Sequence, residues 1–251
     1  MILYEFPLQE RIRTYLRLEH LFIQLQQLLQ RVEAIDHHFA LATLFEILEV
    51  STRSDLKSDL LKDLDKQKHT LDSYRGNPAI AESVLDEVIG QLDQRFEAIN
   101  SLTGKIGQPL TENEWLMAIR SRIAIPGGTC GFDLPSYHAW QHKPTEVRQA
   151  QLQQWALPLK PMADTVHLLL KLLRDSGAPQ KVIVNNGQLQ QSLPQGRTFL
   201  LLRLAIDEAL DMVPEISGNR LMVSVRLTHQ GEDNRQQTVT EDVSLELALC
   251  A

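Results

Sequence analysis

Apolar residues recur at intervals of three and four along most of the first 177 residues, which is the spacing of one helix face. Short stretches with proline, glycine or polar residues interrupt this spacing. The pattern predicts a series of helices. They cover a segment starting near residue 9, then 36–50, 54–74, 79–102, 111–125, 143–157 and 161–176.

Two of these helices, at 54–74 and 79–102, carry long leucine-rich stripes and are joined by a short break, which predicts an antiparallel helical hairpin. In helix 36–50, Asp36 is expected to cap the N-terminus and Phe39 to join the core. The adjacent His37 and His38 are interpreted as capping or surface residues. A capping box at 111–114 is expected to start the fifth helix.

Beyond residue 178 the apolar period falls to two, which is typical of strands with one buried face. Segments 220–228 and 243–249 alternate clearly, and shorter apolar runs lie at 181–184 and 199–206. We expect about four antiparallel strands, with the last two pairing across the polar loop 229–237. Residues 2–6 also alternate, and it is open whether they join this sheet. The predicted fold class is therefore α+β: a mainly helical domain at 1–177, then a small antiparallel β domain at 178–251.

Composition narrows the possible functions. The chain of 251 residues has a formal net charge of -7, which disfavours a general nucleic-acid binder. The sequence shows no apolar run of about 18 residues and no signal-peptide pattern, so we expect a cytoplasmic protein without membrane insertion. Cys130 and Cys250 are expected to be free thiols. Neither a zinc-ligand spacing nor a phosphate-binding loop is found, so no metal or cofactor is expected.

The segment 120–140 differs from the sequences around it, which have helical spacing. Pro126-Gly127-Gly128 breaks the helix, and residues of many chemical types follow. One interpretation is a cysteine-dependent hydrolase, with Cys130 as nucleophile, His138 as base and Asp133 orienting the imidazole. Close spacing is weak support for that, because the fold usually brings triad members together from separate elements.

A second interpretation of the same segment is a peptide-binding surface. Arg120, Arg122, His138 and His142 supply donors near a helix junction, and Trp140 supplies an aromatic wall. The alternative is that the arginine stems pack on the core while their heads cap helix ends.

Three long motifs resemble the ZapD family of bacterial cell-division proteins, and the similarity extends over the whole chain. The first is Phe6-Pro-Leu-Gln-Glu-Arg-Ile-Arg13-Thr-Tyr-Leu-Arg17-Leu-Glu19. The second is the segment 120–140, and the third is Pro214-Glu-Ile-Ser-Gly218.

The resemblance implies a non-enzymatic homodimer that binds the C-terminal tail of FtsZ, bundles FtsZ filaments and supports Z-ring assembly at mid-cell. A two-fold dimer presents each site twice, so it can hold two filaments. Carried over by motif, the tail-binding residues implied by the resemblance are cationic. They are Arg13, Arg17, Arg120 or Arg122, and His138 or His142, with Arg220 and Arg226 in the β region.

Overall fold

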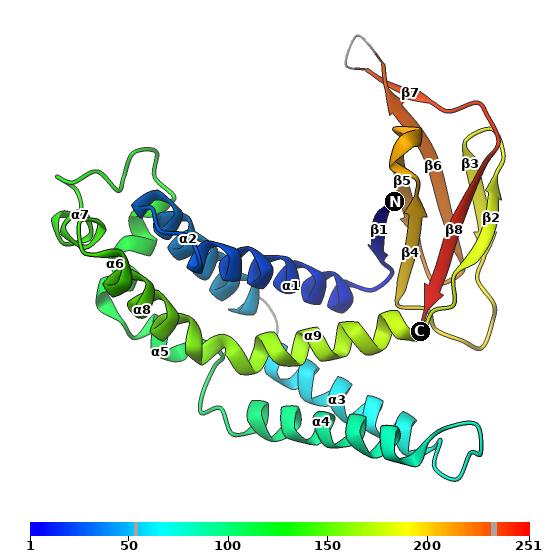
Figure 1. Cartoon of the computed structure of the whole chain (residues 1–251), viewed down its shortest axis with the longest axis horizontal. Helices are drawn as coiled ribbons and strands as arrows, with labels where there is room; N and C mark the ends of the chain where they lie inside the picture. The colour runs from blue at the N-terminus through cyan, green and yellow to red at the C-terminus, as the bar shows by residue number, and fades with distance from the viewer. Residues whose placement is uncertain (53–54, 232–234) are drawn as a thin grey trace. The chain divides into compact units, whose positions relative to one another are not determined.

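The computed structural model describes residues 1–52, 55–231 and 235–251. The chain divides into two compact units: a helical unit, residues 16–169, and a β unit, residues 1–15 and 170–251. The sequence placed the division at 177/178 instead. The difference arises because the first strand pairs within the β unit and the end of the last helix packs there. The predicted α+β class, helices first and an antiparallel β region last, is confirmed (Figure 1).

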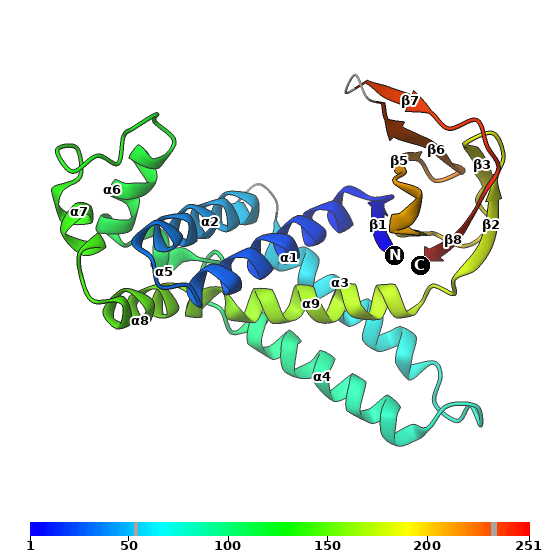
Figure 2. The same cartoon turned by 45° about the horizontal axis from the view of Figure 1, so that its top comes forward.

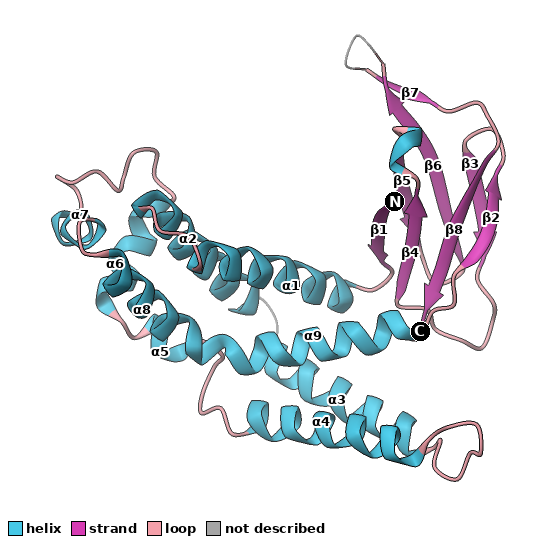
Figure 3. Ribbon diagram, in the orientation of Figure 1, coloured by secondary structure: helices cyan, strands magenta, loops and turns pink. Residues whose placement is uncertain are grey.

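Figure 3 shows the helices in cyan and the loops and turns of the described residues in pink. In chain order they are α1 (Glu10–Leu29), α2 (Ala34–Thr52), α3 (Leu56–Asp72), α4 (Glu82–Asn100), α5 (Gln108–Thr111), α6 (Glu114–Ile123), α7 (Pro135–Gln141), α8 (Thr145–Ala156), the 3-10 turn η1 (Leu157–Leu159) and α9 (Lys160–Asp175).

The predicted hairpin is formed by α3 and α4, which lie side by side in both views (Figures 1 and 2). Leu56, Leu60 and Leu64 recur every four residues on α3 and are buried. Leu85 and Leu92 on α4 are likewise buried. Each helix therefore buries one apolar stripe, as the three-to-four spacing predicted.

The buried face of α2 differs from the predicted one. The helix begins at Ala34, so Asp36 lies in its first turn and is not its N-cap. His37 is buried, together with Leu41 and Leu44, whereas Phe39 is 51% exposed. Two residues correspond to about 200° around a helix, so His37 and Phe39 must face in nearly opposite directions. Placing Phe39 in the core and His37 at the surface was wrong for this reason.

The segment between α4 and α8 is more helical than predicted. The short α5 begins at Gln108, and the segment 120–140 contains α7. The N-cap of α6 is Asn113, whose side chain accepts a hydrogen bond from the backbone N–H of Leu116 at 3.0 Å. The capping box at 111–114 was wrong by two residues, because Thr111 ends α5 and leaves Asn113 to cap α6.

Two antiparallel sheets make up the β unit. The first has the order β1-β4-β8-β2, and the second β3-β6-β5, with β7 also pairing with β6. The strands are β1 (Ile2–Pro7), β2 (Gln180–Val184), β3 (Gln188–Ser192), β4 (Leu201–Ile206), β5 (Val213–Gly218), β6 (Met222–Gln230), β7 (Gln236–Thr238) and β8 (Val243–Cys250), with a 3-10 turn η2 (Glu208–Leu210) between β4 and β5.

The expected pairing of the last two long strands was wrong. β6 and β8 belong to different sheets, and their inward side chains meet in one apolar cluster that includes Leu204, Val225 and Leu245. Each sheet therefore covers the apolar face of the other, which meets the need of a one-sided sheet for cover. The estimate of about four strands was too low. Asn186-Gly187, both with positive φ, turns the chain from β2 in one sheet into β3 in the other.

The first strand joins the sheet at its edge. β1 pairs with β4 in a register that runs from Ile2 opposite Ile206 to Pro7 opposite Leu201. Glu5 of β1 receives two hydrogen bonds from Arg174 of α9, at 2.8 and 2.7 Å, and lies 3.2 Å from Nε of Arg203 on β4. This ion network fixes the end of α9 to the sheet, all within the β unit.

Candidate functional site

Arg120 and Arg122 both lie in the last turn of α6, but they differ in exposure. Arg120 is half-buried, on the side of the helix that also carries the buried Leu116, whereas Arg122 is exposed. Within the part of the chain that the structure describes, neither side chain makes an ion pair. Arg122 therefore presents a free guanidinium to solvent, while the stem of Arg120 packs partly against the helical unit.

His138 lies in α7, and His142 is the C-cap residue that directly follows this helix. Their ring centroids are 4.5 Å apart in an edge arrangement, and Nδ1 of His142 is 2.8 Å from the carbonyl oxygen of His138. Both are exposed. The preceding loop approaches this pair closely, because a Cβ added to Gly131 would lie 3.1 Å from the ring of His138. The structure thus brings the two predicted histidines into contact with each other, and Gly131 lies against the ring of His138.

The side chains of the predicted hydrolase triad do not form a hydrogen-bonded chain. Cys130 is exposed, and Asp133 and Leu134 donate backbone hydrogen bonds to its carbonyl oxygen, each at 3.0 Å. Among the described residues, no hydrogen bond joins the Cys130 thiol to His138 or His138 to the Asp133 carboxylate. A nucleophile activated by a base requires the first of these contacts.

Arg13 and Arg17 are four residues apart on α1 and so share one face of that helix. Arg13 is engaged locally: its Nε lies 3.1 Å from a carboxylate oxygen of Glu10, and its guanidinium carbon lies 5.8 Å from the ring centroid of Phe6. Arg17 is exposed and has no ion-pair partner among the described residues. Of this pair, only Arg13 is engaged by the described residues in an ion pair or a cation–π contact.

The two candidates of the β unit also differ. Arg226 of β6 lies opposite Glu215 of β5 and forms an ion pair with it. Arg220 lies in the connection between these strands and is exposed. The third motif, at 214–218, makes up most of β5.

An aromatic cluster in the helical unit was only partly found from the sequence. The three tryptophans of the chain, Trp115, Trp140 and Trp155, have ring centroids 5.2 to 6.0 Å apart. Tyr137 stacks on Trp140 at 5.8 Å. Trp155 on α8 was missed, although the concentration of all three tryptophans between residues 115 and 155 was a signal for it.

Two histidines of α2, His37 and His38, lie beside this cluster. Nδ1 of His38 lies 2.7 Å from the hydroxyl of Tyr137, and Nε2 of His37 lies 3.0 Å from the carbonyl oxygen of Arg31. Burial lowers the pKa of both imidazoles, and the charge of Arg148 lowers that of His37 further. Burial also raises the pKa of Tyr137. These groups are therefore neutral parts of the packing.

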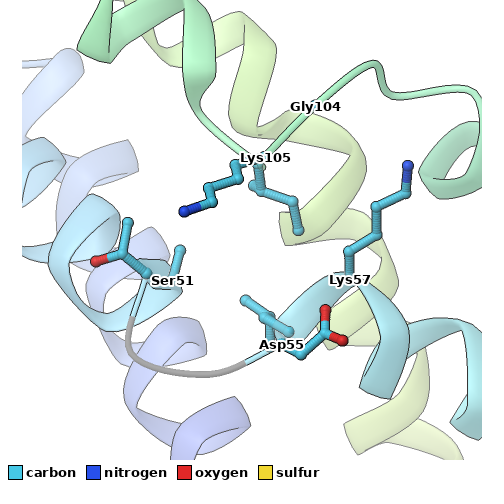
Figure 4. Close-up of a pocket in the computed structure, with 8 residues that line it drawn as sticks. Ser51, Asp55, Lys57, Gly104 and Lys105 are labelled. Atoms are coloured by element: carbon cyan, nitrogen blue, oxygen red, sulfur yellow. The ribbon is translucent and has the colours of Figure 1, made fainter.

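An open pocket of about 320 Å³ is lined by residues at the end of α2, at the start of α3 and in the α4–α5 connection (Figure 4). Two of its polar side chains donate to backbone carbonyl oxygens. Nζ of Lys57 donates to the carbonyl of Leu102 at 2.6 Å, and the hydroxyl of Ser51 donates to that of Ile47 at 2.7 Å. These contacts are those of a junction between helices.

A second open pocket, of about 530 Å³, lies against the aromatic cluster itself and is formed by residues of α6, α7 and α8 with the short connections beside them. Its walls include the three tryptophans, and its rim carries Lys143. Gln151 accepts a hydrogen bond from the indole N–H of Trp140 at 2.8 Å, which fixes the orientation of that wall. We refer to it as the tryptophan pocket.

Residues 1–52, 55–231 and 235–251 contain no group of three or more His, Cys, Asp or Glu side chains arranged to hold a metal ion. Nor do they contain a helix long and apolar enough to cross a membrane.

Comparison with known proteins identifies the family. A family model described as "ZapD: Cell division protein" matches residues 16–226. The chain is 50% identical over 251 residues to "Cell division protein ZapD" of Ralstonia pickettii (strain 12J), covering all of this chain and 99% of that protein. It is 48% identical to the protein of the same name from Janthinobacterium sp. (strain Marseille), covering both chains completely. These matches support a role in cell division, and the chain belongs to the ZapD family of cell division proteins.

Proposed function

We propose that this protein binds the C-terminal tail of FtsZ through exposed cations of its helical unit and, as a homodimer, cross-links FtsZ filaments at the division site. The observation that carries the proposal is the state of Arg17 and Arg122. Both are exposed, and neither has an ion-pair partner in the part of the chain that the structure describes. Free guanidinium groups on the surface suit carboxylates of a flexible partner segment.

Bundling follows from repetition. A two-fold dimer carries every site twice, and tails recur along a filament, so weak binding at each site adds to strong cross-linking. Because exposed charge pairs are screened by salt, we expect bundling to weaken as ionic strength rises from about 0.05 to 0.3 M. Because the net charge of the protein is -7, the net charge does not attract the carboxylates of the tail. The attraction comes from the local cations.

The test is co-sedimentation of the full-length protein with polymerised FtsZ. Arg17→Glu and Arg122→Glu should each abolish pelleting with filaments, while circular dichroism and the mass in solution remain those of the wild-type dimer. Lys62→Glu on the exposed face of α3 has the same change of charge and serves as the matched control. Wild-type pelleting by both arginine variants would refute the proposal.

The difference in exposure also ranks the two arginines of α6. Arg120 is half-buried and Arg122 is exposed, so Arg122→Ala should weaken FtsZ binding more than Arg120→Ala. Arg120→Ala should instead lower the free energy of unfolding, because its stem packs on the helical unit.

A further inference from the structure

The tryptophan pocket has the composition of a site for an apolar side chain of a peptide. Trp115, Trp140 and Trp155 supply its aromatic walls. The volume of about 530 Å³ is in the range of binding pockets and much larger than a defect in packing. Aromatic walls with a few polar groups at the rim favour a branched aliphatic or aromatic side chain.

The charge at the rim limits the choice of ligand. Lys143 is the only ionisable residue among those lining the pocket in the described part of the chain, and it is exposed. Ser136 and Gln151 add neutral polar groups beside it. A ligand whose apolar side chain is accompanied by a carboxylate is therefore complementary to the site, whereas one with a neighbouring cation would be repelled.

A second cation lies in line with the pocket. Arg122 is seven residues after Trp115 on α6, which is close to two full turns, so the two side chains leave the helix on the same side. They are separated by about 10 Å along the helix axis. An extended peptide advances about 3.3 Å per residue, so an acidic residue about three positions from the anchored side chain reaches Arg122.

We propose that the tryptophan pocket holds an apolar side chain of an acidic peptide, with Lys143 and Arg122 pairing with carboxylates on that peptide. This rests on the proposed function, and takes the tail of FtsZ as the peptide. The pocket supplies the affinity that comes from burial, and the two cations set the direction in which the peptide lies.

The experiment measures binding of a synthetic FtsZ-tail peptide to the full-length protein by intrinsic fluorescence, since every tryptophan of the chain lines the pocket. Two variants obstruct the site without removing buried groups. Ala139→Phe places a ring in the pocket from the exposed face of α7, and Lys143→Glu reverses the charge at the rim. Ala150→Phe and Lys62→Glu make the same changes at exposed positions that do not line the pocket.

We expect the peptide to change the tryptophan emission of the wild type, and Ala139→Phe and Lys143→Glu each to raise the Kd about tenfold or more. Loss of one buried apolar side chain changes a binding constant by at least that factor. The two control variants should bind as the wild type does. A peptide in which serine replaces the apolar residues should bind the wild type at least tenfold more weakly than the unchanged peptide does. The two control variants should show the same loss of affinity for the serine peptide.

The outcomes separate the two proposals. If the wild type binds the tail peptide and both pocket variants bind equally well, the pocket assignment is wrong and the tail-binding function stands. If the wild type does not bind the peptide in this assay or FtsZ in co-sedimentation, both proposals are wrong.

Discussion

Replacement of Glu5 by glutamine tests the ion network that joins β1, β4 and α9 in the β unit. The carboxylate of Glu5 accepts two hydrogen bonds from Arg174 and faces Nε of Arg203. The side chains are 17%, 22% and 25% exposed, in that order, so most of each charge is removed from water. Glu5→Gln keeps the shape of the side chain but removes the negative charge that faces Arg174 and Arg203.

The expected cost is about 3 kcal/mol, at the low end of the range for breaking a buried ion pair because the network keeps some contact with water. That loss corresponds to a fall in Tm of roughly 6 to 12 °C for a protein of this size. Arg174→Met retains the packing of the stem and removes the charge. The double variant should therefore cost less than the sum of the two single variants, by about 1 to 2 kcal/mol.

The assay is urea unfolding followed by far-ultraviolet circular dichroism and by tryptophan fluorescence. The tryptophans lie in the helical unit, so separate transitions would assign the loss to the β unit. Glu241→Gln, at an exposed position of the same unit, is the control and should change the stability by less than about 0.5 kcal/mol. A loss below about 1 kcal/mol for Glu5→Gln, or additive effects in the double variant, would refute the reasoning.

Two further predictions concern stability of the helical unit. The pKa values of His37 and His38 are lowered in the folded state, so the unfolded chain takes up protons first as the pH falls through about 6.5. The free energy of unfolding should therefore decrease between pH 6.5 and 5 and be insensitive to these groups above pH 7. His38→Phe should flatten that decrease. If urea titrations give the variant the same dependence of the unfolding free energy on pH as the wild type, the assignment is wrong. Asn113→Ala removes the N-cap of α6 and should cost about 1 kcal/mol, whereas Asn113→Asp should restore the cap; equal loss in both variants would show that the cap contributes nothing.

The helical part was predictable wherever one stripe of leucines is sufficient to define a face. α3 and α4 are of this kind, and their stripes are long enough to average out single errors. α2 is not, because apolar residues surround it and the mean direction of its apolar face is poorly defined. The sequence consequently predicted Phe39 as a core residue and His37 as a surface residue, whereas His37 is buried and Phe39 is exposed.

The pairing of strands depends on contacts distant in sequence, which alternation alone does not specify. Alternation in the segment 220–228 places Leu221, Val223, Val225 and Leu227 on one face. The last three are buried, but Leu221 is 72% exposed because β6 begins only at Met222. The alternation did not show that this face meets β8 across a sandwich instead of lying beside it in one sheet. β3, Gln188–Ser192, was missed because its glutamines mask the pattern, and β5 because Pro214 and Gly218 suggest a turn.

At the candidate site, the sequence indicated the cations but not their partners. Arg226 and Arg17 are alike in sequence terms, yet one pairs with Glu215 across two strands and the other is exposed and without an ion pair among the described residues. The tryptophan pocket depends on bringing together residues of α6, α7 and α8, which a linear motif cannot show.

The pairing of β1 with β4 has a consequence for synthesis of the chain. Ile2 leaves the ribosome about 200 residues before its partner Ile206, which at 5 to 20 residues per second is a delay of roughly 10 to 40 seconds. The helical unit, residues 16–169, is complete well before the second half of the β unit exists. During that interval the apolar first strand has no partner strand, and we expect chaperones that bind extended apolar segments to recognise the nascent chain at its N-terminus.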